Sequence, residues 1–243
     1  MNVVVVDTYK EIGEKAADIF VAQLLMKPNS ILGLATGSTP LSLYEALIQR
    51  YKDGKIDFSQ VTSFNLDEYV GLAPDHEQSY RYFMEKNLFE HINIDKNKTY
   101  VPDGLVKDAD AFGKAYDQQI KDMGYIDLQI LGIGANGHIG FNEPDKIFTY
   151  ATHKVDLAET TIKANSRFFD SIDDVPKQAI SMGIGTIMKS KKIILMATGE
   201  AKAQAIRDAI YTDPAPEHPA SILQFHQNVT VIVDKEAASL LYK

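Results

Sequence analysis

Short runs of aliphatic and β-branched residues alternate with stretches of helical periodicity along the chain. The runs predict buried strands, at 3–6, 31–35, 61–66, 126–133, 193–197 and 229–233. Between them, apolar residues recur at three- and four-residue spacing, which predicts helices around 12–24, 41–48, 80–88, 109–120 and 200–210. Continuous apolar strands that alternate with helices are typical of a parallel sheet covered on both faces. We therefore expect an α/β fold with a mostly parallel sheet.

The domain organisation follows from the same pattern. No linker, low-complexity tract or internal repeat interrupts the sequence, so we expect one domain over residues 1–243. The least regular part is 142–172, which predicts a flap or lid segment. With 45% hydrophobic residues, the chain is long enough to bury a substantial core.

Charge and residue usage exclude several classes of function. A net charge of -8 with scattered lysines and arginines argues against nucleic-acid binding. The absence of cysteine excludes disulfides, thiolate metal sites and cysteine nucleophiles, and a cytoplasmic setting fits best. The apolar run 3–6 has no basic flank before it, and no run is long enough to span a bilayer, so neither a signal peptide nor a membrane segment is expected.

Four polar clusters follow predicted strands, at 35–40, 65–69, 134–138 and 197–202. In open parallel sheets, ligands bind outside the carboxyl ends of the strands. All four clusters are therefore candidates to line one crevice.

The first cluster has the features of an anion site. Gly37 lets the backbone approach a ligand, Ser38 or Thr39 can cap the next helix, and Pro40 suits its first turn. Free amides and the helix dipole then favour an anion. The alternative is an ordinary helix cap.

Two basic residues could complete this anion site. Lys202 lies near the start of its own helix, where acidic residues are usual, so a nearby anion would explain it. Arg167 could close over the same anion with a bidentate grip. Taken alone, a solvated lysine is the common case for Lys202, and Arg167 is just a surface arginine.

Asp67 and Glu68 directly follow a predicted strand. Their side chains should point to different sides, so that only one faces the crevice. A carboxylate there is well placed to abstract a carbon-bound proton next to a carbonyl, and Asp67 is the better candidate. The alternative is that both residues cap the following turn.

The segment 132–137 matches the dinucleotide-binding pattern G-x-G-x-x-G, with Asp156 near the position expected for a ribose-binding acid. That pattern needs a helix to begin there and receive the pyrophosphate. Residues 138–144 show no helical periodicity, so we reject a dinucleotide site.

What remains is a glycine-rich loop that presents His138. Histidine moves protons near neutral pH, and Glu143, five residues on, could fix its tautomer, with Asn136 two residues before. A satisfied structural histidine is the alternative. No histidine pair has metal-ligand spacing, so no metal is expected, and no G-x-S-x-G elbow is present.

With these residues in hand, the chain resembles the glucosamine-6-phosphate deaminases, an aldose-ketose isomerising family. The matching segments are LATGSTP (34–40), FNLDEYVGL (64–72), LGIGANGHIGFNEP (131–144), ANSRFF (164–169), SMGIGTIM (181–188) and PASILQFH (219–226). The resemblance implies a Rossmann-like fold and conversion of glucosamine 6-phosphate and water to fructose 6-phosphate and ammonia. It also implies that the reaction needs no metal or organic cofactor.

The resemblance implies roles for individual residues as well. Asp67 matches the base that moves a proton from carbon 2 to carbon 1 through an enolamine. His138, supported by Glu143 and Asn136, matches the group that opens the pyranose ring. The phosphate-binding positions correspond to Gly37, Ser38, Thr39, Arg167 and Lys202.

Two departures from the family pattern change the expectations. Many relatives have aspartate where this chain has Asn136, and an amide can orient a partner but cannot relay a proton, so Glu143 should be the main charged partner of His138. Longer relatives continue past the position of Lys243 with a tail used in oligomer contacts and allosteric activation. We therefore expect a non-allosteric enzyme, with a monomer as one expected state and self-association left open.

Two other functions stay open at this point. A 6-phosphogluconolactonase-like hydrolase shares the glycine-histidine theme and a phosphosugar substrate, but has no need of the Asp67 base. A sugar-phosphate-sensing domain of a transcription regulator would usually need a DNA-binding segment, whereas this chain begins with a predicted strand.

Overall fold

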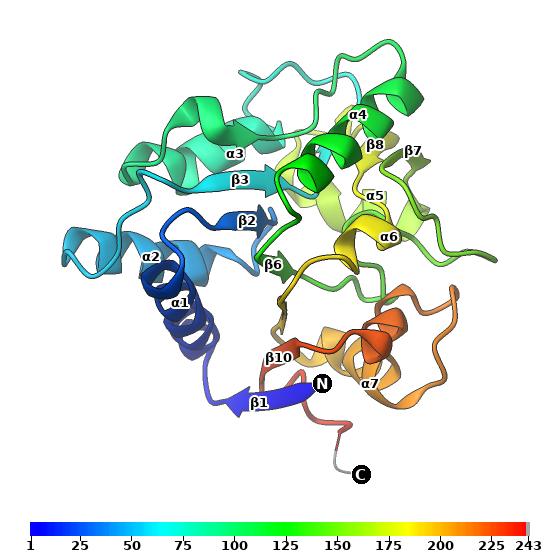
Figure 1. Cartoon of the computed structure of the whole chain (residues 1–243). Coiled ribbons are helices and arrows are strands. Elements are labelled where there is room, and N and C mark those ends of the chain that lie inside the picture. The colour runs from blue at the N-terminus through cyan, green and yellow to red at the C-terminus, as the bar shows by residue number, and fades with distance from the viewer. Residues whose placement is uncertain (242–243) are drawn as a thin grey trace.

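The central sheet is parallel throughout and has the strand order β1-β10-β9-β6-β2-β3-β5 (Figure 1). The computed structural model describes residues 1–241. The strands are β1 (Asn2–Val6), β2 (Ile31–Leu34), β3 (Thr62–Asn65), β5 (Thr99–Tyr100), β6 (Leu128–Leu131), β9 (Ile193–Ala197) and β10 (Val229–Asp234). The predicted α/β class is confirmed. Among the strands of this sheet, β5 was missed, because two residues are too few to show a pattern.

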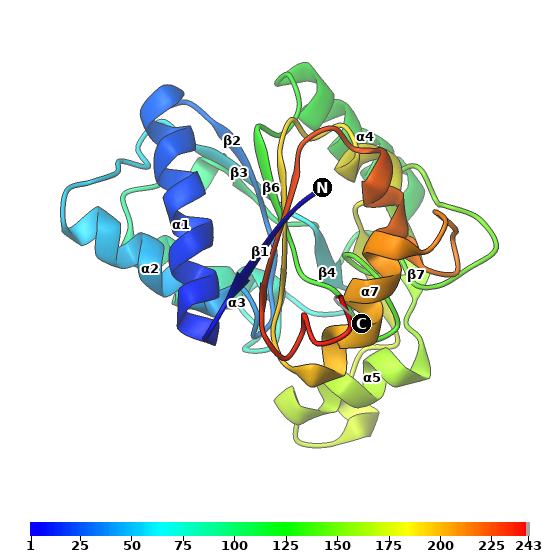
Figure 2. The same cartoon turned by 90° about the horizontal axis from the view of Figure 1, so that it is seen from below.

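Helices cover both faces of this sheet (Figure 2). On one face lie α1 (Tyr9–Met26), α2 (Leu41–Lys52) and α3 (Tyr80–Asn87), and on the other α4 (Ala109–Asp122) and α7 (Ala203–Tyr211). Capping side chains set where three of them begin: Thr8 for α1, Ser79 for α3 and Asp108 for α4. Each accepts a hydrogen bond from an amide in the first turn that would otherwise lack a partner.

A second sheet, which the sequence did not predict, joins β4 (Asp67–Tyr69), β8 (Gln178–Ser181) and β7 (His153–Asp156) in antiparallel pairs. The chain passes from one sheet to the other at Leu66. Its amide donates to the carbonyl of Leu34 in the central sheet (3.1 Å), and its carbonyl accepts from the amide of Met182 beside β8 (2.7 Å). Asp67 is therefore the first residue of a new strand.

The segment 142–172 is more regular than predicted. Residues 142–152 form no helix or strand, but β7, α5 (Glu159–Asn165) and the 3-10 turn η3 (Ser166–Phe168) follow. Leu157 packs with Tyr69 and Phe141 in a small core of its own. The expectation of an irregular segment is wrong for 153–168, because burial against the second sheet orders residues that lack a local pattern.

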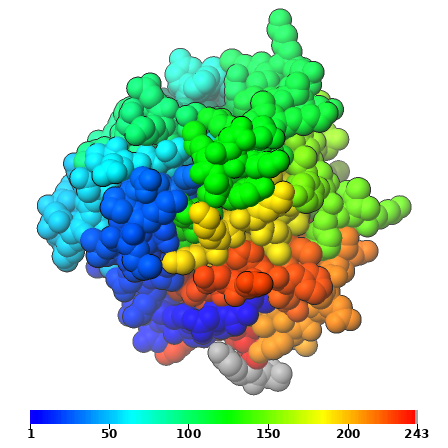
Figure 3. Space-filling view, in the orientation of Figure 1, coloured from blue at the N-terminus to red at the C-terminus, as the bar shows by residue number. Residues whose placement is uncertain are grey.

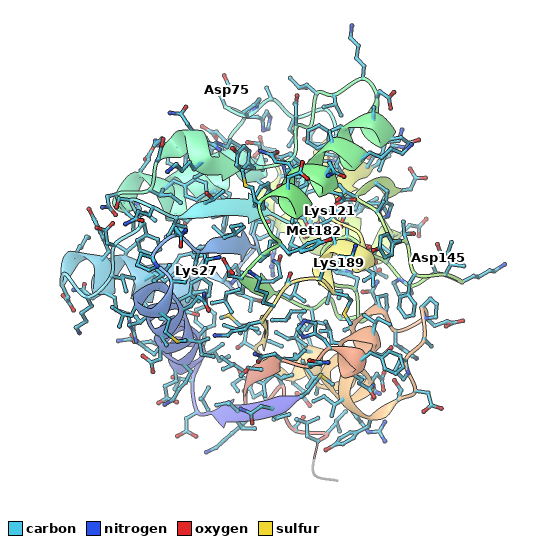
Figure 4. The ribbon with its side chains drawn as sticks, in the orientation of Figure 1. Lys27, Asp75, Lys121, Asp145, Met182 and Lys189 are labelled. Carbon is cyan, nitrogen blue, oxygen red and sulfur yellow. The ribbon has the colours of Figure 1, made fainter. Side chains whose placement is uncertain are left out.

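The main core lies between the central sheet and its helices, with side chains such as Phe20, Leu34 and Ile120 almost fully buried. Burying each such side chain contributes about 1.5–3 kcal/mol before the loss of conformational entropy is counted. Figure 4 shows Met182 inside the molecule, with Asp75 and Asp145 at its periphery.

At the amino end of the sheet, the buried carboxylate of Asp127 ties three segments together. It accepts hydrogen bonds from the amide of Ile31 (2.8 Å) and from the ammonium groups of Lys27 (2.6 Å) and Lys191 (2.7 Å). The N-terminal strand pairs with β10, and the two segments lie side by side in the space-filling view (Figure 3). None of the helices in residues 1–241 combines the length and apolar character that crossing a membrane requires.

Candidate active site

The candidate site lies along the edge of the sheet where the parallel strands end. Because β2, β3, β6 and β9 run in the same direction, the loops that follow them meet at this edge. The loops after β2, β6 and β9 contain three of the polar clusters that the sequence singled out, and the fourth, 65–69, lies where the chain passes from β3 to β4. The side chains in them form two groups, one around His138 and one around Ser38.

The loop after β6 holds His138 in a tight turn. The amide of Gly134 donates to the carbonyl of His138 (2.9 Å), and the amide of Gly137 donates to the carbonyl of Gly134 (3.0 Å). Gly137 has a φ of +86°, which favours glycine. A Cβ on Gly134 would lie 2.4 Å from the imidazole, so this glycine makes the space for the ring. No helix begins between 134 and 143, in agreement with the rejection of a dinucleotide site.

Glu143 is the ionised partner of His138. Its Oε2 lies 3.2 Å from Nδ1 of the imidazole and accepts from Nδ2 of Asn136 (2.7 Å), and its Oε1 accepts from the hydroxyl of Thr161 (2.5 Å). Burial raises the pKa of Glu143, but the hydrogen bond and charge of His138, with Thr161 and Asn136, outweigh it and lower the pKa to about 2. A carboxylate on the Nδ1 side directs Nδ1–H toward Glu143, which leaves Nε2 to exchange a proton.

Asn136 contacts Glu143 and the backbone of His138 rather than the imidazole. Its Oδ1 accepts from the amide of His138 (3.3 Å). The side chain of Asn136 therefore contacts both His138 and Glu143 and does not lie between them.

Asp67 has the environment of a general base. It is 7% exposed, and Oδ2 would lie 3.7 Å from a Cβ on Gly140, so the carboxylate faces the loop that carries His138. Burial raises its pKa to about 8, with a further contribution from the charge of Glu68, and no hydrogen bond from within residues 1–241 opposes the shift. A carboxyl that is half ionised near pH 8 is a far stronger base than an ordinary aspartate.

Glu68 points the other way, toward the start of α3. Its Oε1 accepts from the amides of Tyr69 and Tyr80 (both 2.9 Å), and its Oε2 accepts from the amide of Arg81 (3.0 Å). Glu68 therefore binds the start of α3, whereas Asp67 faces the loop that carries His138.

The second group gathers positive charge beside the loop after β2. Nη2 of Arg167 lies 3.3 Å from Oγ of Ser38. Burial lowers the pKa of Lys202, and the charge of Arg167 lowers it further. A bound anion would offset the repulsion between the two cations.

The backbone after β2 leaves open space beside Gly37. Gly37 has a φ of +93°, and a Cβ there would meet nothing within 4 Å. The expectation that Ser38 or Thr39 caps α2 is wrong, because the cap position is Pro40 and no side chain bonds to the first turn from it. The hydroxyl of Tyr9 accepts from the amide of Ser42 (3.0 Å) and donates to the carbonyl of Ser38 (2.6 Å). Thr39 lies in the same loop, between Ser38 and Ser42 in the sequence.

Contacts from α5 were missed by sequence reasoning. Thr161 bonds to Glu143 as described, and Nδ2 of Asn165 donates to the hydroxyl of Tyr69 (2.8 Å). Neither residue stands at a predicted strand end, and the region showed no periodicity, so no local signal pointed to them. Within residues 1–241, no group of three or more histidine, aspartate and glutamate side chains is placed to hold a metal ion.

Comparison with known proteins identifies the family. A family model described as glucosamine-6-phosphate isomerases/6-phosphogluconolactonase matches residues 7–232. The chain belongs to this family. Glucosamine-6-phosphate deaminases from Halothermothrix orenii and Clostridium perfringens are each 54% identical to it over 241 residues, covering 99% of this chain and 100% of each relative. The resemblance found in the sequence is thereby confirmed.

Solved structures agree with this family membership. The structure described as a monomeric glucosamine-6-phosphate deaminase has a TM-score of 0.96 and 44% identity, covering 99% of this chain and 100% of that one. A 6-phosphogluconolactonase from Trypanosoma brucei has a TM-score of 0.75 at 20% identity, covering 99% and 98% of the two chains. At that identity the lactonase shares the fold, and its activity does not carry over.

Proposed function

We propose that this family member converts glucosamine 6-phosphate and water to fructose 6-phosphate and ammonia. The observation that carries the proposal is the buried Asp67, a base with a pKa near 8 that faces the His138 loop. Moving a carbon-bound proton needs such a base, whereas opening a lactone does not. The deaminases that share 54% of its residues over nearly the whole chain support the same reaction.

The phosphate group would bind at the cationic end of the site. Arg167 and Lys202 supply the charge, and Ser38 supplies a hydroxyl next to Arg167. The backbone of Gly37 and Thr39, in the loop before α2, would add amides. Anchoring there would leave the sugar ring to extend toward the loop of His138.

Ring opening is assigned to His138. Glu143 holds Nδ1–H, so Nε2 can take the proton of the carbon-1 hydroxyl and return one to the ring oxygen. The imidazolium that forms in between is stabilised by the ionised Glu143, and Asn136 keeps both side chains in place.

Deamination of the open chain is assigned to Asp67. Its carboxylate takes the proton from carbon 2 to give an enolamine and returns it at carbon 1, which leaves an imine at carbon 2. Water adds to that imine, the carbon-nitrogen bond breaks, and ammonia leaves with fructose 6-phosphate as the other product. The route consists of ring opening, proton transfers, hydration of the imine and loss of ammonia. None of these steps changes the net oxidation state of the sugar, so the proposed route uses no metal or organic cofactor.

We propose further that residues 1–243 act as one domain, and that the enzyme is a cytoplasmic monomer without allosteric control. The solved relative described as monomeric supports the oligomeric state.

The test is an assay for ammonia and fructose 6-phosphate released from glucosamine 6-phosphate. Stoichiometric formation of both is expected. Correctly folded protein that hydrolyses 6-phosphogluconolactone instead would favour the lactonase reading, and a protein that binds the sugar phosphate without turnover would favour a sensing domain. With ring-closed substrate, His138→Gln should be slowed mainly at ring opening, and a rate equal to the parent's would refute that role.

A further inference from the structure

Asp234 is a buried carboxylate that the proposed mechanism does not use. It is the last residue of β10, 7% exposed, and the register of β10 with β9 places it level with Thr198. Lys235, the next residue, forms an ion pair with Asp7. The neighbouring lysine is therefore not the partner of Asp234.

The hydrogen bonds of Asp234 hold the loop that follows β9. The amide of Gly199 donates to both carboxylate oxygens (3.1 and 3.0 Å), and the hydroxyl of Thr198 donates to Oδ2. The amide of Ala237 donates to Oδ1 (2.8 Å). Three of these four hydrogen bonds come from the loop between β9 and α7.

This loop has a conformation that needs such support. Gly199 has a φ of +86° and begins the 3-10 turn η5 (Glu200–Lys202). The turn is closed by a hydrogen bond from the amide of Lys202 to the carbonyl of Gly199 (3.0 Å). One turn of backbone thus connects the residue that Asp234 holds to the lysine at the cationic end of the site.

Lys202 needs to be held, because both of its surroundings oppose its charge. Burial lowers its pKa, and so does Arg167. The fixed η5 turn keeps the backbone of Lys202 in one place, so its side chain always starts from the same point in the loop after β9.

We infer that Asp234 is a positioning residue for substrate binding, which fixes the 198–202 turn so that Lys202 is held where it can receive the phosphate. The inference rests on the proposed function in taking Lys202 as a phosphate ligand. The competing explanation is that Asp234 only stabilises the fold, through its bond to Ala237.

The experiment measures binding of inorganic phosphate by calorimetry, together with KM and kcat for glucosamine 6-phosphate. Asp234→Ala should weaken phosphate binding about ten-fold or more, equivalent to losing one or two hydrogen bonds to a charged group, and raise KM in parallel. The value of kcat should stay within about three-fold, because Asp67 and His138 are untouched. Asp234→Asn keeps a carbonyl oxygen as an acceptor and should rescue most of the loss.

Two further variants separate positioning from stability. Asp127→Ala removes another buried carboxylate, at the opposite end of the sheet, and should lower the melting temperature without changing phosphate affinity. In a Lys202→Ala background, Asp234→Ala should change phosphate affinity less than about two-fold. Asp234 is inferred to act on phosphate through Lys202, so removing Lys202 also removes the effect of Asp234.

Several outcomes would overturn the inference. These are a folded Asp234→Ala with the parent's phosphate affinity, an undiminished effect in the Lys202→Ala background, or a parent chain that binds no phosphate. If Asp234→Ala does not fold, Thr198→Val replaces it, with about three-fold weaker binding expected and unchanged binding counting against the inference. A parent that binds phosphate but releases no ammonia would overturn the proposed function and leave this inference standing.

Discussion

Asp67 and Glu68 are adjacent in the sequence but have different surroundings, and this difference indicates a different role for each carboxylate. Three backbone amides donate hydrogen bonds to Glu68, whereas Asp67 is buried with no hydrogen bond from residues 1–241 to stabilise its charge. An unstabilised carboxylate is costly for folding and useful for catalysis, because it binds a proton strongly near neutral pH. This property can be measured in two independent ways.

The pH dependence of catalysis is the first. Asp67 must be deprotonated to take the carbon-2 proton, and burial raises its pKa to about 8. We expect kcat/KM to rise with pH along a limb centred near 8, since this quantity reports the free enzyme. A limb near pH 4, the range of an ordinary aspartate, would contradict the assignment.

Stability is the second. The folded pKa of Asp67 is raised above the unfolded value near 4, so the folded state holds a proton that the unfolded state has lost. The stability that Asp67 contributes is therefore fully present below about pH 4 and is lost as pH rises through about 8.

Asp67→Asn cannot ionise and should abolish turnover while retaining phosphate binding. The free energy of unfolding of this variant minus that of the parent should increase from pH 5 to pH 8 by on the order of a few kcal/mol. Urea denaturation at both pH values measures this. Asp75→Asn, an exposed residue at the periphery in Figure 4, is the control and should show no such trend. A trend of the same size in both variants would rule out burial of Asp67 as the cause.

At the scale of elements, the loop after β6 depends on one glycine for its function. Gly134→Ala would place a Cβ 2.4 Å from the imidazole of His138, so the ring must move off Glu143. We expect kcat/KM to fall about 100-fold, as misplacing a catalytic group by about 1 Å commonly does. Gly132→Ala is the matched control in the same loop, because a Cβ there meets nothing within 4 Å. Equal losses in the two variants would show that the loop, rather than the ring, was disturbed.

The helix α5 supports the same histidine from another element. Thr161→Val keeps the shape of the side chain and removes the hydrogen bond to Oε1 of Glu143. A fall in kcat/KM of about three- to ten-fold is expected, the equivalent of roughly one hydrogen bond. Thr160→Val, one residue earlier and exposed, should leave the rate unchanged. A Thr161→Val enzyme with full activity would mean that α5 does not tune the His138–Glu143 pair.

The strands also show which secondary-structure elements a local sequence pattern can predict. The strands of the central sheet were predictable because β-branched runs such as 229–233 are buried on both faces and leave a continuous apolar signal. The strands β4, β7 and β8 were not, since their sequences DEY, HKVD and QAIS contain no continuous apolar run. Asp67 belongs to β4, so its place in the second sheet could not be predicted, although its importance could.

For the whole molecule, the expected state is a monomer that binds substrate without cooperativity. Sedimentation equilibrium should give a mass near 27.0 kDa, the mass of one chain. The dependence of rate on glucosamine 6-phosphate concentration should be hyperbolic, since a single site per monomer has no partner to couple with. A sigmoidal curve, or a mass that rises to a multiple of one chain when substrate is added, would contradict this expectation.

By itself, the sequence determined the α/β class, the strand ends that carry polar clusters and the residue types suited to proton transfer and anion binding. These depend on local periodicity and on the rule that parallel strands bring their carboxyl ends to one edge. Only the tertiary structure decided which side chains meet. The contacts from Thr161 to Glu143, from Arg167 to Ser38 and from Asp234 to Gly199 join residues that are 18, 129 and 35 positions apart. Burial of Asp67 is likewise a property of several elements packed together, and the pKa that suits it for catalysis follows from that packing.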